Sequence, residues 1–327
     1  MNLPPETFVR VPHGDIRAFV SRAARAVGLP DAKALLLADL LTANDLRGVF
    51  SHGSRQIATY AILMRDGRLN SNPQVHVAKQ TPVSLLVDGD GGLGYFPAHE
   101  GTKLLIEKAR AAGIAVLVTR NHGHFGAAGI YSRMTLEHDL LAFVTSGHQL
   151  NLQPGDALYK AAGGSPMSFS APAHLEPPLV LDFGAMHDLY DSSPYREAIA
   201  RLAPGLVLRS IGTGAICQTW GGFLGGVPLD ESRAEKRYVG ANQGSLVIAF
   251  QIGLFMDPLD FRREIDAYSQ RVRTLRPLAG FAAARLAGGP ESEREAEYRE
   301  LGIPVGPEHR EALDGLATEL GIEPPWG

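Results

Sequence analysis

The chain has 327 residues, of which 45% are hydrophobic and 20% are charged, and these proportions are typical of a globular protein with one large or two moderate cores. A formal net charge of -4 without any basic run argues against nucleic acid or an anionic membrane as a partner, and Cys217, the only cysteine, excludes a disulfide framework and a cysteine-based zinc site. Because no apolar stretch is long enough to span a membrane and the N-terminus has no signal core, the sequence predicts a cytoplasmic protein.

The first part of the chain has apolar residues at helical spacing. An apolar stripe over residues 16–27, closed by Gly28, predicts one helix, and Pro30 with Asp31 opens a second that runs through Leu41. A third helix is expected from just after His52 to near Gly67. The Asn- and Pro-containing stretch that follows predicts a domain boundary near residue 75.

The middle of the chain alternates strands and helices. Short β-rich runs predict strands at residues 83–87, 114–119, 140–146, 167–172 and 178–183. A helix is expected from about Pro97 to Ala112, with Gly113 as its C-cap. Further helical faces occur over residues 261–275 and 313–320, so the fold class is α/β, with helices predominating at both ends of the chain.

Residues 45–60, DLRGVFSHGSRQIATY, contain the densest group of candidate catalytic side chains. Ser51 and Ser54 are candidate N-caps, which would place His52 at a helix N-terminus and favour its neutral form. Arg47 and Arg55 flank the same turn. Because a guanidinium binds a carboxylate through two parallel hydrogen bonds and a nearby histidine exchanges protons, the turn suits a small 2-oxo or 2-hydroxy acid. The alternative is a capped, hydrogen-bonded turn without a ligand.

Two other patterns are ambiguous. Gly89, Gly91 and Gly94 spell the G-x-G-x-x-G of a Rossmann phosphate loop, but no acidic residue ends the next strand and Pro97 delays the helix, so we interpret the pattern as a turn. His122 and His124 have the H-x-H spacing that places two ligands on one side of a strand. No cysteine or carboxylate accompanies them, so no metal site is predicted, and a polar surface loop is the alternative.

The pattern D-x-R-G-x-x-S-H-G-x-R-x-x-x-x-Y at residues 45–60 resembles the signature of the malate/L-lactate dehydrogenase family, which also includes ureidoglycolate, sulfolactate and diketogulonate enzymes and cyclic imino-acid reductases. The block H-F-G-A-A-G-x-Y at residues 124–131 is similar to a second family signature, and further matches follow in order over essentially the full length. The resemblance implies a non-Rossmann sheet domain at residues 76–259 that binds NAD or NADP. It also implies a helical substrate-side domain formed by residues 1–75 and 260–327, in a homodimer or higher oligomer.

The resemblance also suggests roles for individual residues. His52 would transfer a proton, Ser51 would orient it, Asp182 would support the site electrostatically, and His124 would be a second polar contact or the alternative acid. The expected substrate contacts are Arg47, Arg55 and Tyr60. The expected cofactor contacts are His148, Gly164, Ser165, Pro166, Asp182, Phe183, Gly184, Gln243, Gly289, Pro290 and Glu291.

The chain departs from the family pattern on the cofactor side. Gly164 and Ser165 replace a Thr-Asn pair, Met186 ends a segment that usually reads Ala-Thr-Ser, and Gln243 replaces a lysine. A lysine beside a phosphate makes a charge-assisted bond of roughly 1.5–3 kcal/mol that glutamine cannot replace. Two hypotheses follow: a nicotinamide-dependent oxidoreductase acting on a small 2-oxo or 2-hydroxy acid or a cyclic imino acid, or a redox-inactive descendant that acts as an isomerase, a lyase or a carboxylate-binding protein.

Overall fold

The computed structural model describes residues 4–234 and 237–326, and the chain forms two compact units, Met1–Pro73 with Gly288–Gly327, and Gln74–Ala287. The sequence predicts the second boundary at residue 260, but α8 (Pro258–Arg273) belongs to the second unit. Asp266 on α8 accepts backbone hydrogen bonds from His174 and Leu175 at 3.0 and 2.9 Å, and these bonds tie the helix to that unit. The predicted boundary is therefore wrong by about one helix and its following loop; residues 1–3 and 327 of the predicted substrate-side domain lie outside the described residues.

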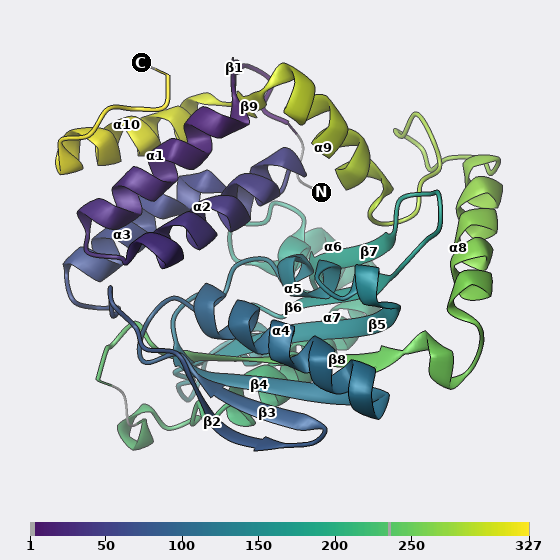
Figure 1. The fold of residues 1–327 in the computed structure, drawn as a ribbon, viewed down its shortest axis with the longest axis horizontal. Coiled ribbons are helices and arrows are strands. Elements are labelled where there is room, and N and C mark those ends of the chain that lie inside the picture. Colours follow the sequence, from purple (N-terminus) through teal and green to yellow (C-terminus); the bar gives the residue numbers. More distant parts are fainter. Residues whose placement is uncertain (1–3, 235–236, 327) are drawn as a thin grey trace. The chain divides into compact units, whose positions relative to one another are not determined.

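The first unit joins the two ends of the chain (Figure 1). Its helices are α1 (His13–Ala26), α2 (Asp31–Leu46), α3 (Ile57–Arg65), α9 (Gly289–Leu301) and α10 (Pro307–Leu320). Their apolar faces form a core that includes the fully buried Phe19, Leu41 and Leu313. The unit is not all-helical as expected, because β1 (Val9–Val11) pairs antiparallel with β9 (Ile303–Val305). Three-residue strands are too short to give a periodic sequence signal.

The second unit contains a seven-stranded sheet in the order β2-β3-β4-β8-β5-β6-β7. The strands are β2 (His76–Thr81), β3 (Ser84–Asp88), β4 (Ile114–His122), β5 (Leu140–His148), β6 (Pro166–Ala171), β7 (Leu179–Gly184) and β8 (Gln243–Gln251). β3 and β4 run parallel, whereas the other neighbouring pairs among these strands are antiparallel. A Rossmann sheet is mostly parallel, so the prediction of an α/β fold with a non-Rossmann sheet is confirmed.

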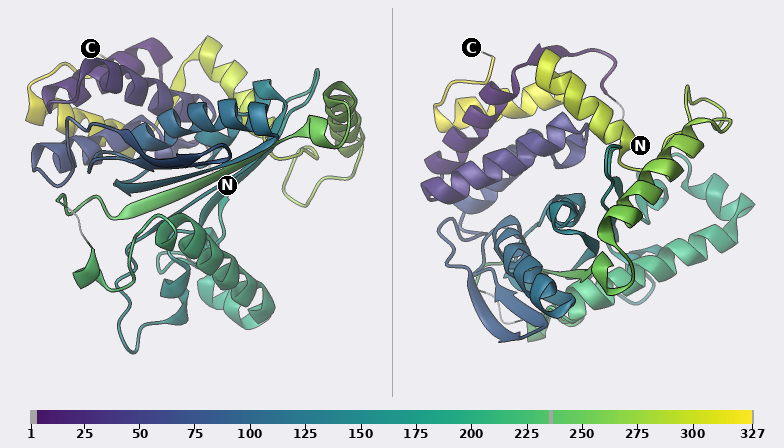
Figure 2. Two further views of the ribbon diagram at one scale, coloured as in Figure 1. Left: turned by 60° about the horizontal axis from the view of Figure 1, so that its bottom comes forward. Right: turned by 45° about the vertical axis from the view of Figure 1, so that its right-hand side comes forward.

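Helices cover both faces of this sheet (Figure 2). α4 (Tyr95–Ala112) packs on one face, and α7 (Pro204–Cys217), which continues into a π-helical turn at Gln218–Phe223, covers the other. Two shorter helices are α5 (Gly129–Arg133) and α6 (Arg196–Leu202). α4 begins two residues before the predicted Pro97, because proline is tolerated in a first helical turn, where its missing N–H costs nothing. Gly113 ends α4 at φ +89°, as its predicted C-cap role requires.

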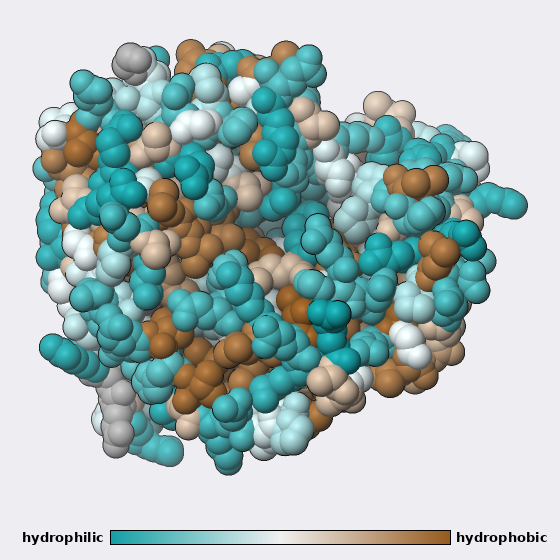
Figure 3. Space-filling view, viewed as in Figure 1, coloured by the Kyte–Doolittle hydropathy of each residue, from teal (hydrophilic) through white to brown (hydrophobic). Residues whose placement is uncertain are grey.

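The face shown in Figure 3 is mostly hydrophilic, with hydrophobic residues gathered in patches. Within residues 4–234 and 237–326, no helix combines the length and hydrophobicity needed to cross a membrane. α8 stands apart from the sheet in Figure 1, and its Tyr268 is 54% exposed. This helix is thus held to its unit mainly by polar contacts, and it leaves apolar area uncovered.

Candidate functional site

The turn between α2 and α3 differs from the turn predicted from the sequence. Two short 3-10 turns, Phe50–His52 and Ser54–Gln56, precede α3, so the α-helix begins at Ile57. His52 therefore does not lie at an α-helix N-terminus, and the helix-dipole reason for its neutral form is wrong. Neither Ser51 nor Ser54 caps a helix with its side chain.

Ser51 and His52 form a hydrogen-bonded pair, with Oγ of Ser51 2.9 Å from Nδ1 of His52. Their backbone is fixed as well, because Asn44 donates to the carbonyl of His52 at 2.9 Å and Gln56 donates to that of Ser51 at 2.7 Å. Burial lowers the pKa of His52, which keeps the ring neutral near pH 7. With Nδ1 engaged by Ser51, Nε2 is the ring atom suited to proton exchange.

Three buried residues of the first unit, Asp45, Ser54 and His309, form a hydrogen-bonded group that we call the polar frame. The carboxylate of Asp45 is fully buried, and its Oδ2 accepts the backbone N–H of Ser54 at 2.9 Å. A Cβ on Gly53 would lie 1.7 Å from Oδ1 of Asp45, so only glycine fits there. Burial raises the pKa of Asp45 to about 7, although the hydrogen bonds from Ser54 oppose this. The frame explains in physical terms why the motif has an aspartate and a glycine at these positions.

The frame also includes a histidine that the sequence analysis missed. Nε2 of His309 lies 2.9 Å from Oγ of Ser54, and both residues are buried. Burial, together with the nearby charge of Arg55, lowers the pKa of His309 to about 4, so its ring is neutral. Because the two residues are 255 positions apart, no local spacing could have revealed the contact.

The three predicted substrate contacts have different environments. Arg47 is already paired, with its Nε 2.8 Å from Oε2 of Glu295, so the prediction that it binds a carboxylate is not supported. Tyr60 is only 2% exposed and belongs to the core of the first unit, so its role as a substrate contact stays a prediction. Arg55 is half exposed and pairs with the exposed Glu308 at 3.1 Å, a solvent-screened contact that a ligand could displace.

Arg55 and Ser51 line a cavity of about 540 Å³ within the first unit, together with Phe50 and His309. Cavities of this size hold small organic ligands. The lining combines apolar residues and the hydroxyl groups of Thr7 and Ser51 with one guanidinium and the carboxylates of Glu6 and Glu308. A ligand carboxylate would therefore bind Arg55 by replacing Glu308 as its partner. The structure therefore brings Ser51, Arg55 and His309 to one cavity within this unit.

Most of the predicted cofactor residues share one edge of the sheet in the second unit. β5 ends at His148 and β7 ends at Gly184, whereas β6 begins at Pro166 and β8 begins at Gln243. The strand register pairs His148 with Gln243, and Pro166 with Gly184. Antiparallel strands that alternate in direction bring these termini together, so residues about 100 positions apart in sequence become neighbours.

Ser165 is the residue of this edge that stands out. Its φ is +45°, its side chain is 2% exposed, and within the described residues its Oγ has no hydrogen-bond partner. A buried hydroxyl without a partner costs about 1–3 kcal/mol. Beside it, a Cβ on Gly164 would have open space around it, with the ring of Pro166 3.8 Å away.

The two histidines after β4 have separate surroundings. His122 is the last residue of the strand and fully buried, and its nitrogens lie 2.7 Å from the hydroxyl of Thr119 and 2.7 Å from the carbonyl of Gly123. Burial lowers its pKa to about 4. His124 lies beyond the strand end and is half-buried, so the two do not alternate along one strand as the metal reading requires. Within the described residues, no group of His, Cys, Asp or Glu could hold a metal ion.

A family model described as malate/L-lactate dehydrogenase matches residues 11–186 of the chain, more than half of its length. The chain belongs to the malate/L-lactate dehydrogenase family. Malate dehydrogenase of Pyrococcus horikoshii is 25% identical, over 97% of this chain and 97% of its own. L-sulfolactate dehydrogenase of Methanocaldococcus jannaschii is 24% identical, over 90% and 92%. The solved structure of malate dehydrogenase from P. horikoshii OT3 superposes with a TM-score of 0.82 at 23% identity, covering 99% of both chains, which supports the fold.

The glycine-rich turn of this family member is not a phosphate loop. The N–H groups of Gly89, Gly91 and Gly94 donate to the carbonyls of Arg120, Asn121 and His124 at 2.9–3.0 Å. A phosphate loop needs backbone N–H groups that point at the ligand. The N–H groups of the three glycines instead donate to carbonyls at the end of β4 and just after it, which agrees with the interpretation of the pattern as a turn.

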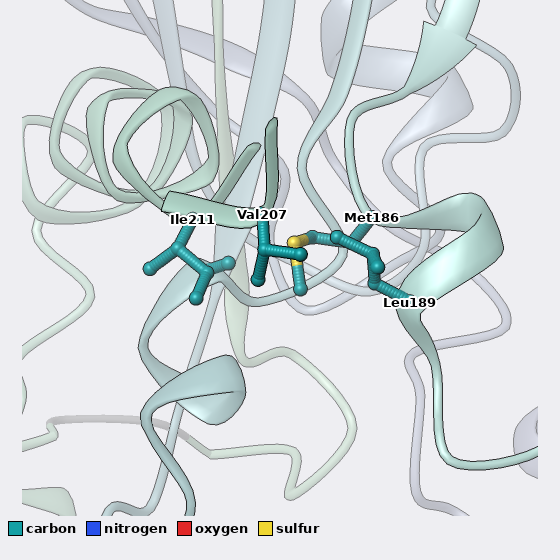
Figure 4. Packing of buried hydrophobic residues seen from close by; sticks show 5 residues of the cluster. Met186, Leu189, Val207 and Ile211 are labelled. Carbon is teal, nitrogen blue, oxygen red and sulfur yellow. The ribbon is translucent and has the colours of Figure 1, made fainter. Parts of the chain in front are cut away.

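Two departures from the malate/L-lactate dehydrogenase pattern, Met186 and Gln243, have different surroundings. Met186 is 2% exposed and packs with Leu189, Val207 and Ile211 in a satellite core under α7, as Figure 4 shows. Its replacement of a polar residue is thus a packing feature. Gln243, in contrast, lines a cavity of about 290 Å³ in the second unit.

The remaining predicted residues of this family member lie elsewhere. Asp182 is exposed on β7, where its Oδ2 would be 2.5 Å from a Cβ on Gly129, and Phe183 is 40% exposed beside it. Gly289, Pro290 and Glu291 form the first turn of α9 in the first unit, so they do not belong to the sheet edge. Oε2 of Glu291 accepts the backbone N–H of Gly288 at 3.2 Å, which uses this side chain as a helix cap.

Proposed function

We propose that this protein transfers a hydride between NAD or NADP and a small 2-oxo or 2-hydroxy acid, or a cyclic imino acid. Family membership supports a dehydrogenase that acts on hydroxy acids. Relatives named malate and L-sulfolactate dehydrogenase suggest a substrate with a second acidic group. The observation that carries the proposal is that Ser51, the hydrogen-bond partner of His52, lines the same cavity of the first unit as Arg55; His52 itself is not among the lining residues.

His52 exchanges the proton in this proposal. Its lowered pKa favours a neutral ring, and Nδ1–H then donates to Ser51 and leaves the lone pair of Nε2 as a base. In the oxidation direction, Nε2 takes the proton of the substrate hydroxyl while the hydride leaves C2. Arg55 holds the carboxylate and so fixes the orientation of C2. His124 and the exposed carboxylate of Asp182 are proposed as supporting polar groups.

The sheet edge of the second unit fits a dinucleotide. The buried Oγ of Ser165, without a partner within the described residues, is a hydrogen-bonding group that a ligand would satisfy. Gly164 leaves space beside it, and His148, Pro166, Gly184 and Gln243 occupy the same edge. A nicotinamide bound there supplies or accepts the hydride.

We further propose that the protein is a cytoplasmic homodimer or higher homo-oligomer. α8 and the residues that follow it support self-association, because Tyr268 within the helix and Leu275, two residues beyond its end, are 54% and 60% exposed. Apolar area of this kind on a protein is commonly covered by a partner. Size-exclusion chromatography with light scattering tests this: a double substitution Tyr268→Glu with Leu275→Glu shifts an oligomer toward monomer.

A titration of the protein with NADH and with NADPH, followed by nicotinamide fluorescence, tests the dehydrogenase proposal. Saturable binding of either, with oxidation of the bound cofactor by a panel of 2-oxo acids, is the expected result. If neither binds at about millimolar concentration, the proposal fails, and the redox-inactive carboxylate-binding alternative takes its place.

A further inference from the structure

The cavity that contains Gln243 lies where strands β3, β4 and β8 end or begin. Its walls combine these strand termini with the loop that leads into β8, drawn at the lower left of Figure 1. Its volume of about 290 Å³ is at the lower limit of ligand pockets, so it suits one part of a dinucleotide and not the whole molecule. The polar groups used below are Arg120, Arg233, Asn121, Gln149, Asn242 and Gln243.

Arg120 is held in a fixed orientation at one side of the cavity. Its Nε donates to Oδ2 of Asp88 at 2.8 Å, while Asn121 and the backbone of Asp90 donate to Oδ1 at 2.9 Å each. Burial alone would raise the pKa of Asp88, but these hydrogen bonds and the charge of Arg120 keep it below its ordinary value. The carboxylate is thus charged and saturated, and no bond of either terminal amino group of Arg120 is recorded within the described part of the chain.

Arg233 provides a second guanidinium from the loop. It ends a short turn that Asp230 stabilises, with Oδ1 accepting from the backbone and the hydroxyl of Ser232 at 3.0 and 2.7 Å. Gln149 anchors the start of this loop by donating to the carbonyls of Pro228 and Leu229 at 2.6 and 3.0 Å. Among the residues that the structure describes, Arg233 has no recorded ion pair.

The charges of the cavity do not cancel. Among the lining residues, Asp88 is neutralised by Arg120, and Arg233 adds a second guanidinium beside the amides of Asn242 and Gln243. The charge of Arg233 also helps to lower the pKa of Asp230, but Asp230 is not one of the lining residues. Gln243 brings hydrogen-bonding capacity without charge, and the arginines therefore supply the electrostatic attraction. Two guanidiniums with neighbouring amide donors match the charge and the several acceptor oxygens of a phosphate group.

We propose that this cavity binds a phosphate group of the nicotinamide dinucleotide, with Arg120 and Arg233 as its charged donors. The inference rests on the proposed function, and it names the residues that supply the positive charge in this chain. Two phosphates share this chemistry, the pyrophosphate that both dinucleotides carry and the 2′-phosphate that only NADP carries. Binding experiments distinguish them.

The test is calorimetric titration of the native protein and of Arg233→Gln with four ligands, namely NADH, NADPH, inorganic pyrophosphate and adenosine 2′-monophosphate. Arg233→Gln is the main variant because Arg233 is exposed and its loss leaves the Asp88 cluster intact. Loss of a charge-assisted contact is expected to weaken binding by about tenfold or more. Arg120→Gln should act in the same direction, and Arg209→Gln on α7, an exposed arginine outside the cavity, is the matched control.

Equal weakening of NADH, NADPH and pyrophosphate assigns the pyrophosphate to the cavity. Weakening of NADPH and adenosine 2′-monophosphate alone assigns the 2′-phosphate and explains a preference for NADP. If Arg233→Gln binds all ligands as the native protein and the control do, the inference is wrong. If the native protein binds neither dinucleotide but binds pyrophosphate or the 2′-monophosphate in an Arg233-dependent way, the proposed function fails while the phosphate pocket stands; if it binds none of the four, both fail.

Discussion

The turn at residues 45–60 pairs more of its buried polar groups within the protein than the edge of the sheet does. In the turn, Ser51 is paired with His52, and Ser54 is paired with both Asp45 and His309, whereas Oδ1 of Asp45 has no partner among the described residues. At the edge, the hydroxyl of Ser165 is buried without a partner in the described residues. A site with internally paired groups is preorganised for proton transfer, whereas a site with unmatched groups gains these bonds from a ligand.

The two regions also differ in what sets their geometry. The turn depends on a fully buried carboxylate under a glycine that no other residue can replace. The edge depends on strand register, because His148, Pro166, Gly184 and Gln243 are brought together by pairing alone. Substitutions in the turn should therefore affect catalysis and folding together, whereas substitutions at the edge should affect ligand binding with little effect on folding.

The largest expected effect is that of His52→Ala on turnover. Loss of a general acid or base lowers kcat/KM by about 10²- to 10⁴-fold, and the half-buried ring is not part of the main core, so the protein should remain folded. Steady-state kinetics with a 2-hydroxy acid measure it. His76→Ala, which removes an exposed histidine on β2, is the control. A decrease of less than about threefold would remove His52 from the mechanism.

The next effect concerns folding, through Gly53→Ala. The new methyl group would lie 1.7 Å from Oδ1 of Asp45, and such overpacking of a buried group costs about 3 kcal/mol. Urea unfolding monitored by circular dichroism gives the value. Gly315→Ala on α10 has open space around its Cβ and should stabilise the protein by up to about 1 kcal/mol. Equal urea midpoints for Gly53→Ala and Gly315→Ala would mean that the polar frame can move enough to accommodate a methyl group at position 53.

The frame should also give the protein a distinct pH dependence. Asp45 has a pKa of about 7 when folded against an ordinary 3.8, so between these values the folded state holds a proton that the unfolded chain lacks. Binding of this proton adds to the unfolding free energy. The added stability is complete below about pH 4 and is lost as the pH rises to about 7, by roughly 1.4 kcal/mol per pH unit. The difference in unfolding free energy between native protein and Asp45→Asn should therefore shrink by about 2–3 kcal/mol from about pH 5 to about pH 7. A difference that does not change with pH would show that Asp45 titrates normally.

Sequence alone predicts the edge of the sheet less well than the turn. The five predicted strands correspond to β3–β7, because their apolar runs are short and rich in β-branched residues. β2 was not predicted because all six of its residues are exposed and nothing alternates along it. The sequence analysis does not predict β8, although residues 246–250 form a largely buried apolar run, and this strand, late in the chain, inserts between β4 and β5. Without it, neither the strand order nor the position of Gln243 can be derived.

The motif at residues 45–60 identified the family but not the contacts that hold the turn. Glu295, Glu308 and His309, which pair with Arg47, Arg55 and Ser54, are about 250 positions away. The domain boundary failed for a similar reason: α8 has an amphipathic sequence, and what assigns it to the second unit is the hydrogen bonding of Asp266 to a distant loop. Side-chain contacts over such separations leave no periodic signal in one sequence.

The smallest expected effect, from Ser165→Ala, distinguishes the two regions most directly. Removing this buried hydroxyl should leave the unfolding free energy unchanged or raise it by up to about 1 kcal/mol, because no hydrogen bond to another described residue is lost. If a dinucleotide satisfies this hydroxyl, its affinity should fall by about three- to tenfold, corresponding to one neutral hydrogen bond. Ser51→Ala is the counterpart in the turn: it should lower kcat and leave dinucleotide affinity unchanged, since its hydroxyl pairs with His52. Loss of stability in Ser165→Ala without loss of dinucleotide affinity would mean that the hydroxyl of Ser165 has a partner within the protein, as that of Ser51 does.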